Sequence, residues 1–232
     1  MRLAEGAGHR AQRRVAWAHE IGAIRNWLDH HAPSELPSVS MIARGRADPF
    51  RVLVSTMISL RTKDEVTLAA SRRLLFAAST PRRLAALSKA RIARLIYPAG
   101  FYLTKAAHLS KTASIILRDH GGEVPRSMEE LLDLPGVGRK TANLVRNLGF
   151  GLPGICVDTH VHRVSNRLGW VSAPTPEKTE KALMERLPRR YWIEINELLV
   201  RFGQRVCVPI SPRCSACPCA HACPRVGVVK SR

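Results

Sequence analysis

Apolar residues along this chain recur every three to four positions, which is the spacing of one buried helix face. One such face begins after Asp48-Pro49, a plausible helix N-cap with a proline in the first turn. Its apolar positions are Phe50, Leu53, Val54, Met57 and Ile58. A second helix is expected to open with the capping-box spacing of Thr62 and Glu65. Its apolar side would consist of Val66, Ala69, Ala70 and Leu74.

The remaining helix signals are of the same kind and recur along most of the chain. Capping signals occur at Thr80-Pro81, at Ser127 with Glu130, and at Thr175-Pro176. A long helix is expected from about Leu103 to His120, because Gly121-Gly122 can end it. Convincing alternation of apolar and polar residues with a period of two is missing. The sequence therefore predicts an all-α fold, built from short helices with short connections.

Charge adds the first indication of function. The 232 residues include 37 Lys and Arg but only 18 Asp and Glu, which gives a net charge of +19. Such an excess favours a polyanionic partner. Acidic membrane lipid is one such partner, but the basic residues are spread through helical segments and are not gathered beside a lipid anchor or an amphipathic tail. Nucleic acid is therefore the expected partner.

The same sequence bears on size and location. Its length allows one large domain or two small ones. No run of about 18 apolar residues exists, so no membrane span is expected. The arginine-rich N-terminus lacks an apolar core of signal-peptide length, which argues against secretion. An organelle transit peptide is a weaker alternative, because Glu5 and Glu20 are acidic. We expect a cytoplasmic, nucleoid-associated protein of a bacterium or archaeon.

The segment around residue 135 predicts a helical hairpin. A short helix over residues 128–133 is followed by a tight turn, Leu134-Pro135-Gly136-Val137-Gly138, and a second helix begins near Arg139. The glycines allow backbone torsions that other residues resist. Gly138 and the residues after it would point free amide N–H groups outward, where they could bind phosphate. A bare G-x-G favours an ordinary corner between helices, but the full LPGVGRKTA string on so basic a chain favours phosphate binding.

Lys140 lies in the first turn of that second helix. The positive helix N-terminus and partial burial would both lower the pKa of its ammonium group. A neutral amine can attack an electrophilic sugar carbon and hold it as a Schiff base. The alternative is a solvated lysine that touches phosphate.

Asp158 follows 18 residues later, inside VDTHVHRV. It is a natural N-cap for the helix that carries His160 and Arg163. A cap and nothing more is a serious alternative to a role in chemistry. The two interpretations are compatible, because a capping carboxylate is held rigidly and can still face a positive charge that develops on a sugar.

Cysteines are concentrated near the C-terminus. Of six in the chain, five lie within the last 26 residues. Such clustering indicates metal binding rather than a disulfide framework. Four of them have the spacing C-x6-C-x2-C-x5-C, and their thiolates could hold either zinc or an iron–sulfur cluster, between which spacing alone does not decide. The sixth, Cys156, is expected to be a small buried residue beside Asp158.

The LPGVGRKTA string resembles the helix-hairpin-helix signature of DNA-repair glycosylases. It is followed by Phe150-Gly151-Leu152-Pro153-Gly154 and then by Val157-Asp158-Thr159-His160. Together these motifs resemble the endonuclease III family of base-excision DNA glycosylases, over roughly residues 15–225. The resemblance implies that Lys140 displaces a damaged base and forms a Schiff base, while Asp158 deprotonates the lysine or stabilises the oxocarbenium-like state. Bifunctional members then cleave the strand on the 3′ side by β-elimination.

The resemblance also implies a DNA surface and a cofactor. Beside the hairpin lysine and the aspartate, the expected DNA contacts are Gly136, Gly138, Arg139, Thr141, His160 and Arg163. The cysteine spacing is that of the family's [4Fe–4S] loop, whose ligands here would be Cys207, Cys214, Cys217 and Cys223. Cys219 is surplus to this pattern. We interpret the cluster as structural, because it would organise a DNA-contacting loop flanked by Arg205, Arg213 and Arg225.

A base stacked in duplex DNA must be flipped out before its sugar can be attacked. Two segments, residues 58–64 and 100–105, align with the loops that open the duplex in this family. Arg61 stands where glutamine is commonest, so it would contact the opposite base differently. Phe101 stands where leucine is frequent and could stack on neighbouring bases. The alternative for Phe101 is a core aromatic beside Tyr97.

The implied architecture is a helix-hairpin-helix glycosylase fold of two helical domains with a DNA cleft between them. Residues 42–152 would form a six-helix barrel that contains the hairpin. Residues 15–41 and 153–225 would form the iron–sulfur domain, and Lys140 and Asp158 would face each other across the cleft. Residues 1–14 and 226–232 are expected to be basic, flexible termini.

The function implied is that of a bifunctional glycosylase and AP lyase, monomeric, acting on double-stranded DNA with oxidised pyrimidines such as thymine glycol, or with abasic sites. One rival is a relative with weak glycosylase activity that works mainly as an AP lyase. Another removes mismatched adenine or thymine, but adenine-removing relatives lack the hairpin lysine and carry an extra C-terminal domain. A third rival is a non-catalytic DNA-binding module with a structural zinc.

Overall fold

The computed structural model of this chain describes residues 16–33, 36–44 and 48–232. These residues form helices and loops and contain no strand, so the prediction of an all-α fold is confirmed. The elements are α1 (Trp17–His31), α2 (Ser38–Ala43), α3 (Pro49–Ser59), α4 (Asp64–Ala77), α5 (Pro81–Ala85), α6 (Lys89–Ile96), α7 (Tyr102–Asp119), α8 (Met128–Leu132), α9 (Arg139–Leu144), a π-helical turn η1 (Val145–Gly149), α10 (Thr159–Arg167), α11 (Pro176–Arg186), a 3-10 turn η2 (Arg189–Tyr191) and α12 (Ile195–Arg205).

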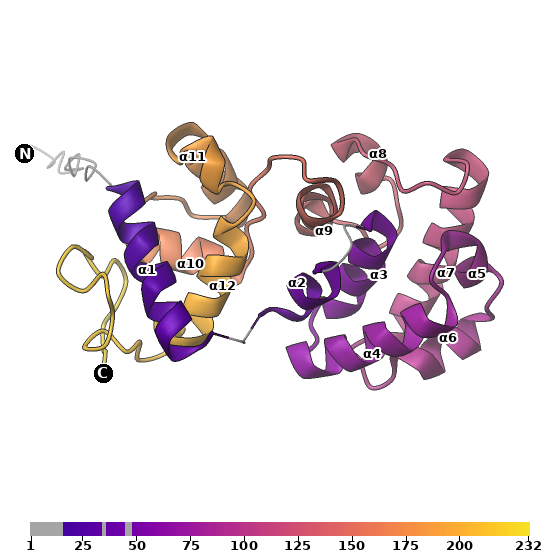
Figure 1. Cartoon of the computed structure of the whole chain (residues 1–232), viewed down its shortest axis with the longest axis horizontal. Coiled ribbons are helices and arrows are strands. Elements are labelled where there is room, and N and C mark those ends of the chain that lie inside the picture. The colour runs from indigo at the N-terminus through magenta and orange to yellow at the C-terminus, as the bar shows by residue number, and fades with distance from the viewer. Residues whose placement is uncertain (1–15, 34–35, 45–47) are drawn as a thin grey trace, which may run out of the picture.

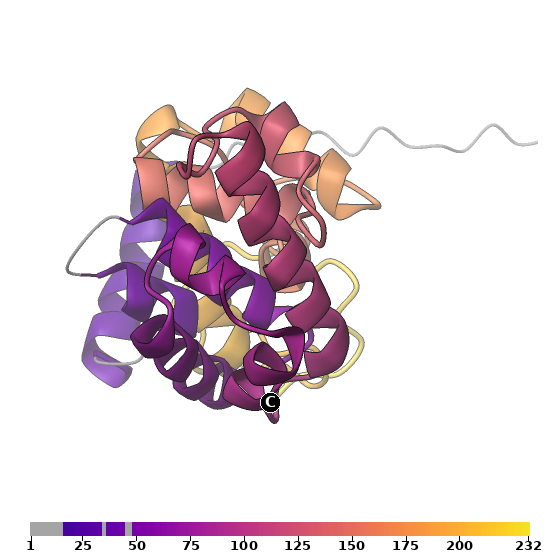
Figure 2. The ribbon, with the colours of Figure 1, turned by 90° about the vertical axis from the view of Figure 1, so that its right-hand side faces the viewer.

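The helices gather in two groups, which lie side by side along the long axis of the molecule (Figure 1). Helices α2 to α9 form one group around the buried α3, which packs against α2, α4, α7, α9 and η1. Helices α1, α10, α11 and α12 form the other, in which the N-terminal α1 packs against the C-terminal α12. Figure 2 shows the first group from its outer end. Within the described part of the chain, every helix is too short or too polar to cross a membrane.

Each group of helices has its own apolar core. The first core runs from Val39 in α2 to Val145 in η1. The second joins Ile21, Ile24 and Leu28 of α1 to Trp170 and the apolar side of α12. Val39 and Ile42 of α2 pack in the first core, so α2 lies with the helices that follow it.

Buried polar contacts tie α1 to the C-terminal helices. The Trp170 Nε1–H donates to Glu20 Oε2 at 2.8 Å, where both side chains are buried. Arg201 Nη2 donates to the carbonyl oxygen of Ala32 at 2.8 Å. The second group is therefore built from segments far apart in the sequence.

Most of the predicted helix starts are confirmed. Asp48 Oδ1 accepts the amide N–H groups of Phe50 and Arg51, and the hydroxyls of Thr80, Ser127 and Thr175 cap α5, α8 and α11. The long helix α7 covers Tyr102–Asp119, within one residue of the expected bounds at each end.

The capping box predicted at Thr62 and Glu65 is wrong. Helix α4 begins at Asp64 after Lys63, without a side-chain cap. The hydroxyl of Thr62 is engaged elsewhere, because it accepts the amide N–H of Gly100 at 3.1 Å. The buried side of α4 is also turned from the predicted one. It retains Ala70 and Leu74, but Ala69 is exposed, and the buried polar positions are Thr67 and Ser71.

The end of the chain folds back on the cysteine loop. Arg232 donates its backbone N–H to the carbonyl oxygen of Pro212 at 2.8 Å, and its own carbonyl oxygen accepts from Ser215 at 2.9 Å. The last residue thus contacts the cysteine loop, while the flexibility expected for residues 226–232 stays a prediction. The expected flexible residues 1–14 lie outside the described part of the chain.

Candidate active site at the border of the two cores

The predicted hairpin consists of α8, a turn and α9. Gly136 has φ +78°, and a Cβ at this position would come within 2.6 Å of the His108 ring on α7. Thr112, also on α7, donates its hydroxyl to the carbonyl oxygen of Pro135 at 3.1 Å. Gly138 precedes α9 without any side-chain cap, so the first amides of α9 are left for another partner. The turn is therefore pressed against α7, and Gly136 lies where this close approach requires a glycine.

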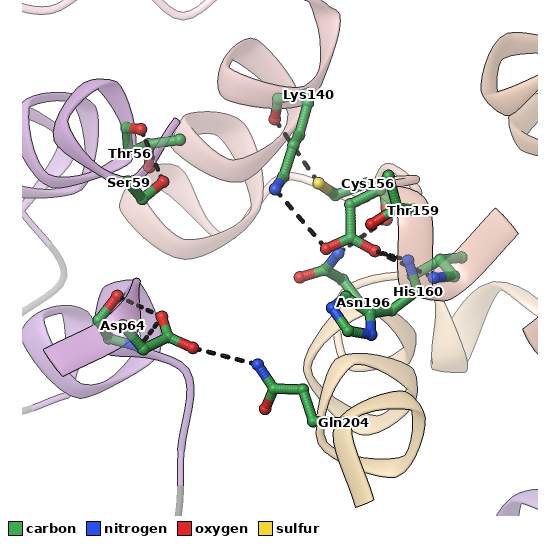
Figure 3. A network of polar contacts seen from close by, with 12 residues as sticks. Thr56, Ser59, Asp64, Lys140, Cys156, Thr159, His160, Asn196 and Gln204 are labelled. Atoms are coloured by element: carbon green, nitrogen blue, oxygen red, sulfur yellow. Dashed lines mark hydrogen bonds and ion pairs between the residues drawn. The ribbon is translucent and has the colours of Figure 1, made fainter. Parts of the chain in front are cut away.

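Lys140 and Asp158 face each other across the border between the two groups of helices. Lys140 Nζ lies 3.6 Å from Asp158 Oδ2, and the two side chains are 38% and 11% exposed. Figure 3 shows Lys140 reaching from α9 toward Thr159 and His160 at the start of α10. The sequence placed these two residues together by resemblance alone, and the structure brings them into contact.

Asp158 has the position expected of a helix cap. Its Oδ1 accepts the amide N–H groups of His160 at 2.9 Å and Val161 at 3.0 Å. The other carboxylate oxygen, Oδ2, is the one that faces Lys140. One carboxylate thus caps α10 with one oxygen and presents the second to the lysine, which makes the two interpretations of Asp158 compatible in geometry.

A pocket of about 260 Å³ opens beside this pair. Its lining comes from both groups of helices and includes Ser38, Ser40, Thr62, Asp64, Leu144, Asn196 and Gln204 besides Lys140, Asp158 and His160. Two hydrogen bonds connect residues on either side of this pocket through Cys156. Cys156, fully buried, donates its thiol to the carbonyl oxygen of Lys140 at 3.6 Å, and Asn196 Nδ2 donates to the carbonyl oxygen of Cys156 at 3.0 Å. Burial raises the pKa of the Cys156 thiol, so it stays protonated.

A second carboxylate lies across the pocket from Asp158. Asp64 Oδ1 accepts the hydroxyl of Ser38 at 2.7 Å, and its Oδ2 accepts Gln204 Nε2 at 3.2 Å (Figure 3). This bond joins the start of α4 to α12 and thus bridges the two groups of helices. Sequence reasoning did not single out Asp64, Gln204 or Asn196, because no motif distinguishes polar residues that meet only in the folded chain.

Two of the predicted DNA contacts on the hairpin helix, Arg139 and Thr141, have side chains that are paired or buried within the protein. The guanidinium of Arg139 makes a two-pronged pair with the buried Glu180 of α11, at 2.7 and 3.0 Å, and Asn143 Nδ2 donates to the same carboxylate at 3.2 Å. The Glu180 carboxylate raises the pKa of Arg139. The side chain of Thr141 is buried at 1% exposure, so only its backbone remains for a phosphate contact.

His160 and Arg163 lie against α12. A Cβ at Gly203 would come within 2.8 Å of the His160 ring and 2.9 Å of the Arg163 guanidinium, so glycine is needed there. Arg163 donates to the carbonyl oxygens of Gly203 at 2.9 Å and Cys207 at 3.1 Å. Burial lowers the pKa of His160 and of Arg163. Arg163 therefore supports the cysteine loop, whereas His160 lines the pocket.

Arg61 and Phe101, the residues expected to open the duplex, lie side by side. Each has a left-handed backbone, with φ 51° and 57°. The Arg61 guanidinium carbon is 5.5 Å from the centre of the Phe101 ring. Phe101 is 62% exposed, while Tyr97 packs its ring on Tyr102. The structure thus excludes the core-aromatic alternative for Phe101.

The four cysteines of the C-x6-C-x2-C-x5-C motif line one small cavity. Cys207, Cys214, Cys217 and Cys223 share its wall with Arg167, Arg213 and Arg225, and every cysteine in the described residues is a free thiol. Arg167 Nη1 donates to Cys207 Sγ at 3.7 Å, and the backbone N–H of Arg225 donates to Cys223 Sγ at 3.4 Å. These donors suit thiolates that hold an electron-rich group.

The cysteine cavity offers sulfur donors for a metal centre. In the described residues, no three His, Cys, Asp or Glu side chains converge closely enough to hold one metal ion. Four cysteine thiols around one cavity are donors that either zinc or an iron–sulfur cluster takes. Cys219 does not line the cavity: it is buried, and its thiol donates to the carbonyl oxygen of Glu20 at 3.9 Å.

Comparison with known proteins agrees with this arrangement. Residues 54–189 match the HhH-GPD superfamily base excision DNA repair protein family. The chain is 49% identical over 176 residues to endonuclease III of Thermotoga maritima, and the match covers 76% of this chain and 83% of that protein. It is 46% identical over 184 residues to endonuclease III homolog 2, chloroplastic, of Arabidopsis thaliana, but it spans only 48% of that longer relative.

The fold is similar to a solved structure described as a trapped endonuclease III–DNA covalent intermediate. The TM-score is 0.77 at 30% sequence identity, and the match covers 91% of this chain and 97% of that one. The sequence matches, the fold and the facing lysine and aspartate agree with one another. The chain therefore belongs to the endonuclease III family of base-excision repair DNA glycosylases and AP lyases, within the HhH-GPD superfamily.

Proposed function

We propose that this protein removes oxidised pyrimidines such as thymine glycol from duplex DNA and cleaves the resulting abasic site, with Lys140 as nucleophile. The observation that carries the proposal is the Lys140–Asp158 pair, 3.6 Å apart beside a pocket between the two cores. An amine is the nucleophile that accounts for both base removal and strand cleavage through one covalent intermediate.

The chemistry begins when Lys140 gives up a proton. Asp158 Oδ2 is close enough to take that proton, directly or through one water. The Nζ lone pair then forms a bond to C1′ of the flipped nucleotide, while the N-glycosidic bond breaks and the base leaves with its electron pair. Asp158, held by two amide N–H groups, also faces the positive charge that develops on the sugar.

Strand cleavage follows from the same intermediate. Opening of the sugar ring gives a Schiff base between Lys140 and C1′. Loss of a proton from C2′ and departure of the 3′ phosphate break the C3′–O bond, and water then releases the lysine. No further nucleophile from the protein is needed, so the pair of Lys140 and Asp158 suffices for a bifunctional enzyme.

The pocket supports a flipped pyrimidine as substrate. Enzymes of this kind read an extruded base by hydrogen bonds within a fitted cavity. Ser38, Ser40 and Asn196 provide such groups in the lining, and the added oxygen atoms of an oxidised pyrimidine are suitable partners. We propose that Arg61 and Phe101, exposed together at the ends of two loops, fill the gap that the base leaves.

DNA would lie along the border between the two groups of helices. We place phosphate contacts at the backbone of Gly136, Gly138 and Thr141 and at Arg139, with His160 and Arg163 on the opposite side. Arg139 retains its pair with Glu180 there, and Arg163 acts through the loop that it supports. The net charge of +19 favours this partner.

For the cysteine cavity we propose a [4Fe–4S] cluster held by Cys207, Cys214, Cys217 and Cys223. Bound there, the cluster would fix the fold of the C-terminal loop, and the Arg167 and Arg225 contacts would offset its negative charge. Iron and acid-labile sulfide, in equal amounts of about four per chain, are expected in the purified protein. Stoichiometric zinc without iron would overturn the assignment. Cys217→Ser should release the cluster, whereas Cys219→Ser should retain it.

We also propose that the two cores correspond to two folding units, that the protein acts as a monomer, and that it belongs to a bacterial or archaeal cell. The first rests on the separate cores of the described residues. A single sedimenting species of about the mass of one chain, 25.7 kDa, would support the second.

Borohydride trapping tests the central proposal. Wild-type protein incubated with a thymine glycol duplex and borohydride is expected to form a covalent complex, because borohydride reduces the Schiff base. Lys140→Gln should form none, while Lys111→Gln, a change at an exposed lysine of α7, should behave as wild type. Base removal without trapping would instead favour a monofunctional relative. Trapping only on preformed abasic DNA would favour an enzyme that acts mainly as an AP lyase.

A further inference from the structure

Two loops are in close contact: the Arg61 loop, residues 60–63 between α3 and α4, and the Phe101 loop, residues 97–101 between α6 and α7. The amide N–H of Gly100 donates to Thr62 Oγ1 at 3.1 Å. A Cβ at Gly100 would collide with the carbonyl oxygen of Arg61, so this approach is open only to glycine. The two loops come from opposite ends of different helices, since one follows α3 and the other precedes α7.

Lys105, in the first turns of α7, reaches into the same junction. Its side chain is buried, with 7% of the residue exposed. Nζ donates to the carbonyl oxygens of Ile58 at 2.6 Å and Leu60 at 2.5 Å, and to Thr62 Oγ1 at 2.8 Å. An ammonium group has three donors, and these three acceptors lie on both sides of Arg61.

The acceptors explain how a buried lysine is tolerated. The carbonyl groups of Ile58 and Leu60 belong to the C-terminal end of α3, where carbonyl groups lack partners within the helix and favour a positive charge. Lys105 therefore closes the end of α3 from the start of α7. Burying an ammonium group on neutral oxygen atoms is costly, and a stable fold could end α3 with an ordinary glycine instead. The buried lysine therefore lowers the stability of the fold, and a residue with a purely structural role would not have to do so.

The position of the contacts points to the reason. Next to these contacts, the backbone is left-handed at Arg61 and again at Phe101. The two exposed side chains contact each other, and the Arg61 guanidinium carbon lies 5.5 Å from the centre of the Phe101 ring. A left-handed backbone at residues other than glycine costs about 1 kcal/mol or more each and persists only where neighbours hold it. Lys105 and Thr62 are the neighbours that hold both loops at once.

We infer that Lys105 is a positioning residue for base opening: its ammonium group ties the Arg61 loop to the Phe101 loop, so that both side chains enter the duplex as one wedge. This inference rests on the proposed function and deepens it. Without the tie, each loop would have to be ordered separately when DNA binds, and part of the binding energy would be lost to that ordering. The chemistry at Lys140 would be left intact.

The experiment compares two rates in each variant. One is base removal from a thymine glycol duplex, which requires base opening, and the other is strand cleavage of a duplex with a preformed abasic site, which has no base to unstack. Lys105→Met is expected to lower the first by about 10- to 100-fold, as a loss of positioning does, and to leave the second near the wild-type rate. Lys111→Met is the matched control, because Lys111 lies on the same helix and is exposed.

Two additions separate positioning from folding. Gly100→Ala forces the two loops apart without removing a charge, because its Cβ would collide with the carbonyl oxygen of Arg61, and it should lower the same rate selectively. In an Arg61→Ala, Phe101→Ala background, Lys105→Met should cause little further loss, because a tie has no effect once the wedge is gone. Thermal unfolding of each variant identifies any that do not fold, and if Lys105→Met is one of them, Gly100→Ala then carries the test.

The two rates distinguish a positioning role of Lys105 from a purely structural one. If Lys105→Met lowers both rates in proportion, or if its effect persists in full without the wedge side chains, Lys105 is only a structural residue and the inference fails. If neither rate changes, it fails as well. Wild-type protein that neither removes thymine glycol nor traps on abasic DNA would instead overturn the proposed function.

Discussion

The proposed reaction centre and the proposed base-opening loops of this protein are built by opposite means. Lys140 and Asp158 stand at the starts of α9 and α10, on ordinary backbone, and one of them is itself a helix cap. Arg61 and Phe101 stand on left-handed backbone outside the helices, exposed to solvent. The first pair is held by helix geometry, whereas the second is held by a buried lysine, a hydroxyl and a glycine.

The difference matches what each region has to do. Bond formation at C1′ requires the nucleophile and its proton acceptor within a fraction of an ångström, which rigid helix ends provide. Base opening requires side chains that project beyond the protein surface into another molecule. Loops can do this only if something within the protein holds them, and Lys105 has that position here. Changes in one region should therefore leave the function of the other intact.

The largest effect is expected at Asp158, where a cap and a proton acceptor coincide. Asp158→Asn keeps an oxygen that can accept the His160 and Val161 amides, but it loses the carboxylate that faces Lys140. We expect the single-turnover rate of base removal to fall by about 10²- to 10⁴-fold, as for the loss of a general base, while thermal stability stays near that of wild type.

Asp158→Ala completes this test. It should lose about 0.5–2 kcal/mol of stability in addition, because the cap of α10 is lost as well. If Asp158→Asn were as active as wild type, the carboxylate would be a cap alone. If both variants lost the same stability, the capping contacts would not matter to the fold.

A smaller effect is expected at the wedge residues. Phe101→Ala removes an aromatic ring whose stacking on a base is worth about 1–3 kcal/mol, so base removal from a thymine glycol duplex should fall by roughly 5- to 150-fold. Trapping on an abasic duplex should change little. Phe76→Ala is a suitable control, because Phe76 is 92% exposed on α4. It lies outside both the lining of the pocket beside Lys140 and the two base-opening loops. Equal losses on both substrates would contradict the separation of the two regions.

A modest effect on every substrate is expected at the contact between α9 and α11. Glu180→Gln replaces the buried carboxylate that holds Arg139 and Asn143, and it should cost about 1–3 kcal/mol of stability, as for a buried charged hydrogen bond. Because the same contact orients the helix of Lys140, trapping should slow several-fold on every substrate alike. Glu185→Gln, an exposed change on the same helix, should alter neither quantity. A selective loss on thymine glycol would instead place Glu180 with the wedge.

The same division explains what could be predicted from the sequence. Helix starts, the hairpin and the facing of Lys140 and Asp158 are local features or follow from a recognisable motif. Asp48, Thr80, Ser127 and Thr175 cap as predicted because each acts on a backbone amide two or three residues away. For such residues the sequence neighbour is also the structural neighbour.

Thr62 shows why the rest could not be predicted. Its spacing from Glu65 satisfies a capping box, but its hydroxyl contacts Gly100 and Lys105, about 40 residues away in the chain. Similarly, the hairpin sequence gives no sign that Arg139 pairs with Glu180, 41 residues away in the chain. A local pattern cannot register a distant partner that competes for the same group, and the base-opening loops consist mostly of such partners.

The smallest predicted effect concerns the charge of Lys105. Burial lowers the pKa of its ammonium group from the ordinary 10.5 to about 8. Between these values the unfolded chain binds more protons at this site than the folded protein does, so the free energy of unfolding rises with pH. The stabilising contribution is complete above about pH 10.5 and is lost as the pH falls through about 8. Urea unfolding midpoints measured from pH 7 to 10 should therefore rise with pH more steeply in wild type than in Lys105→Met, and Lys111→Met should follow wild type. Parallel curves for wild type and Lys105→Met would mean that the lysine keeps its ordinary pKa in the folded protein. Burial of Lys105 would then not lower the stability of the fold, and this difference between the base-opening loops and the reaction centre would disappear.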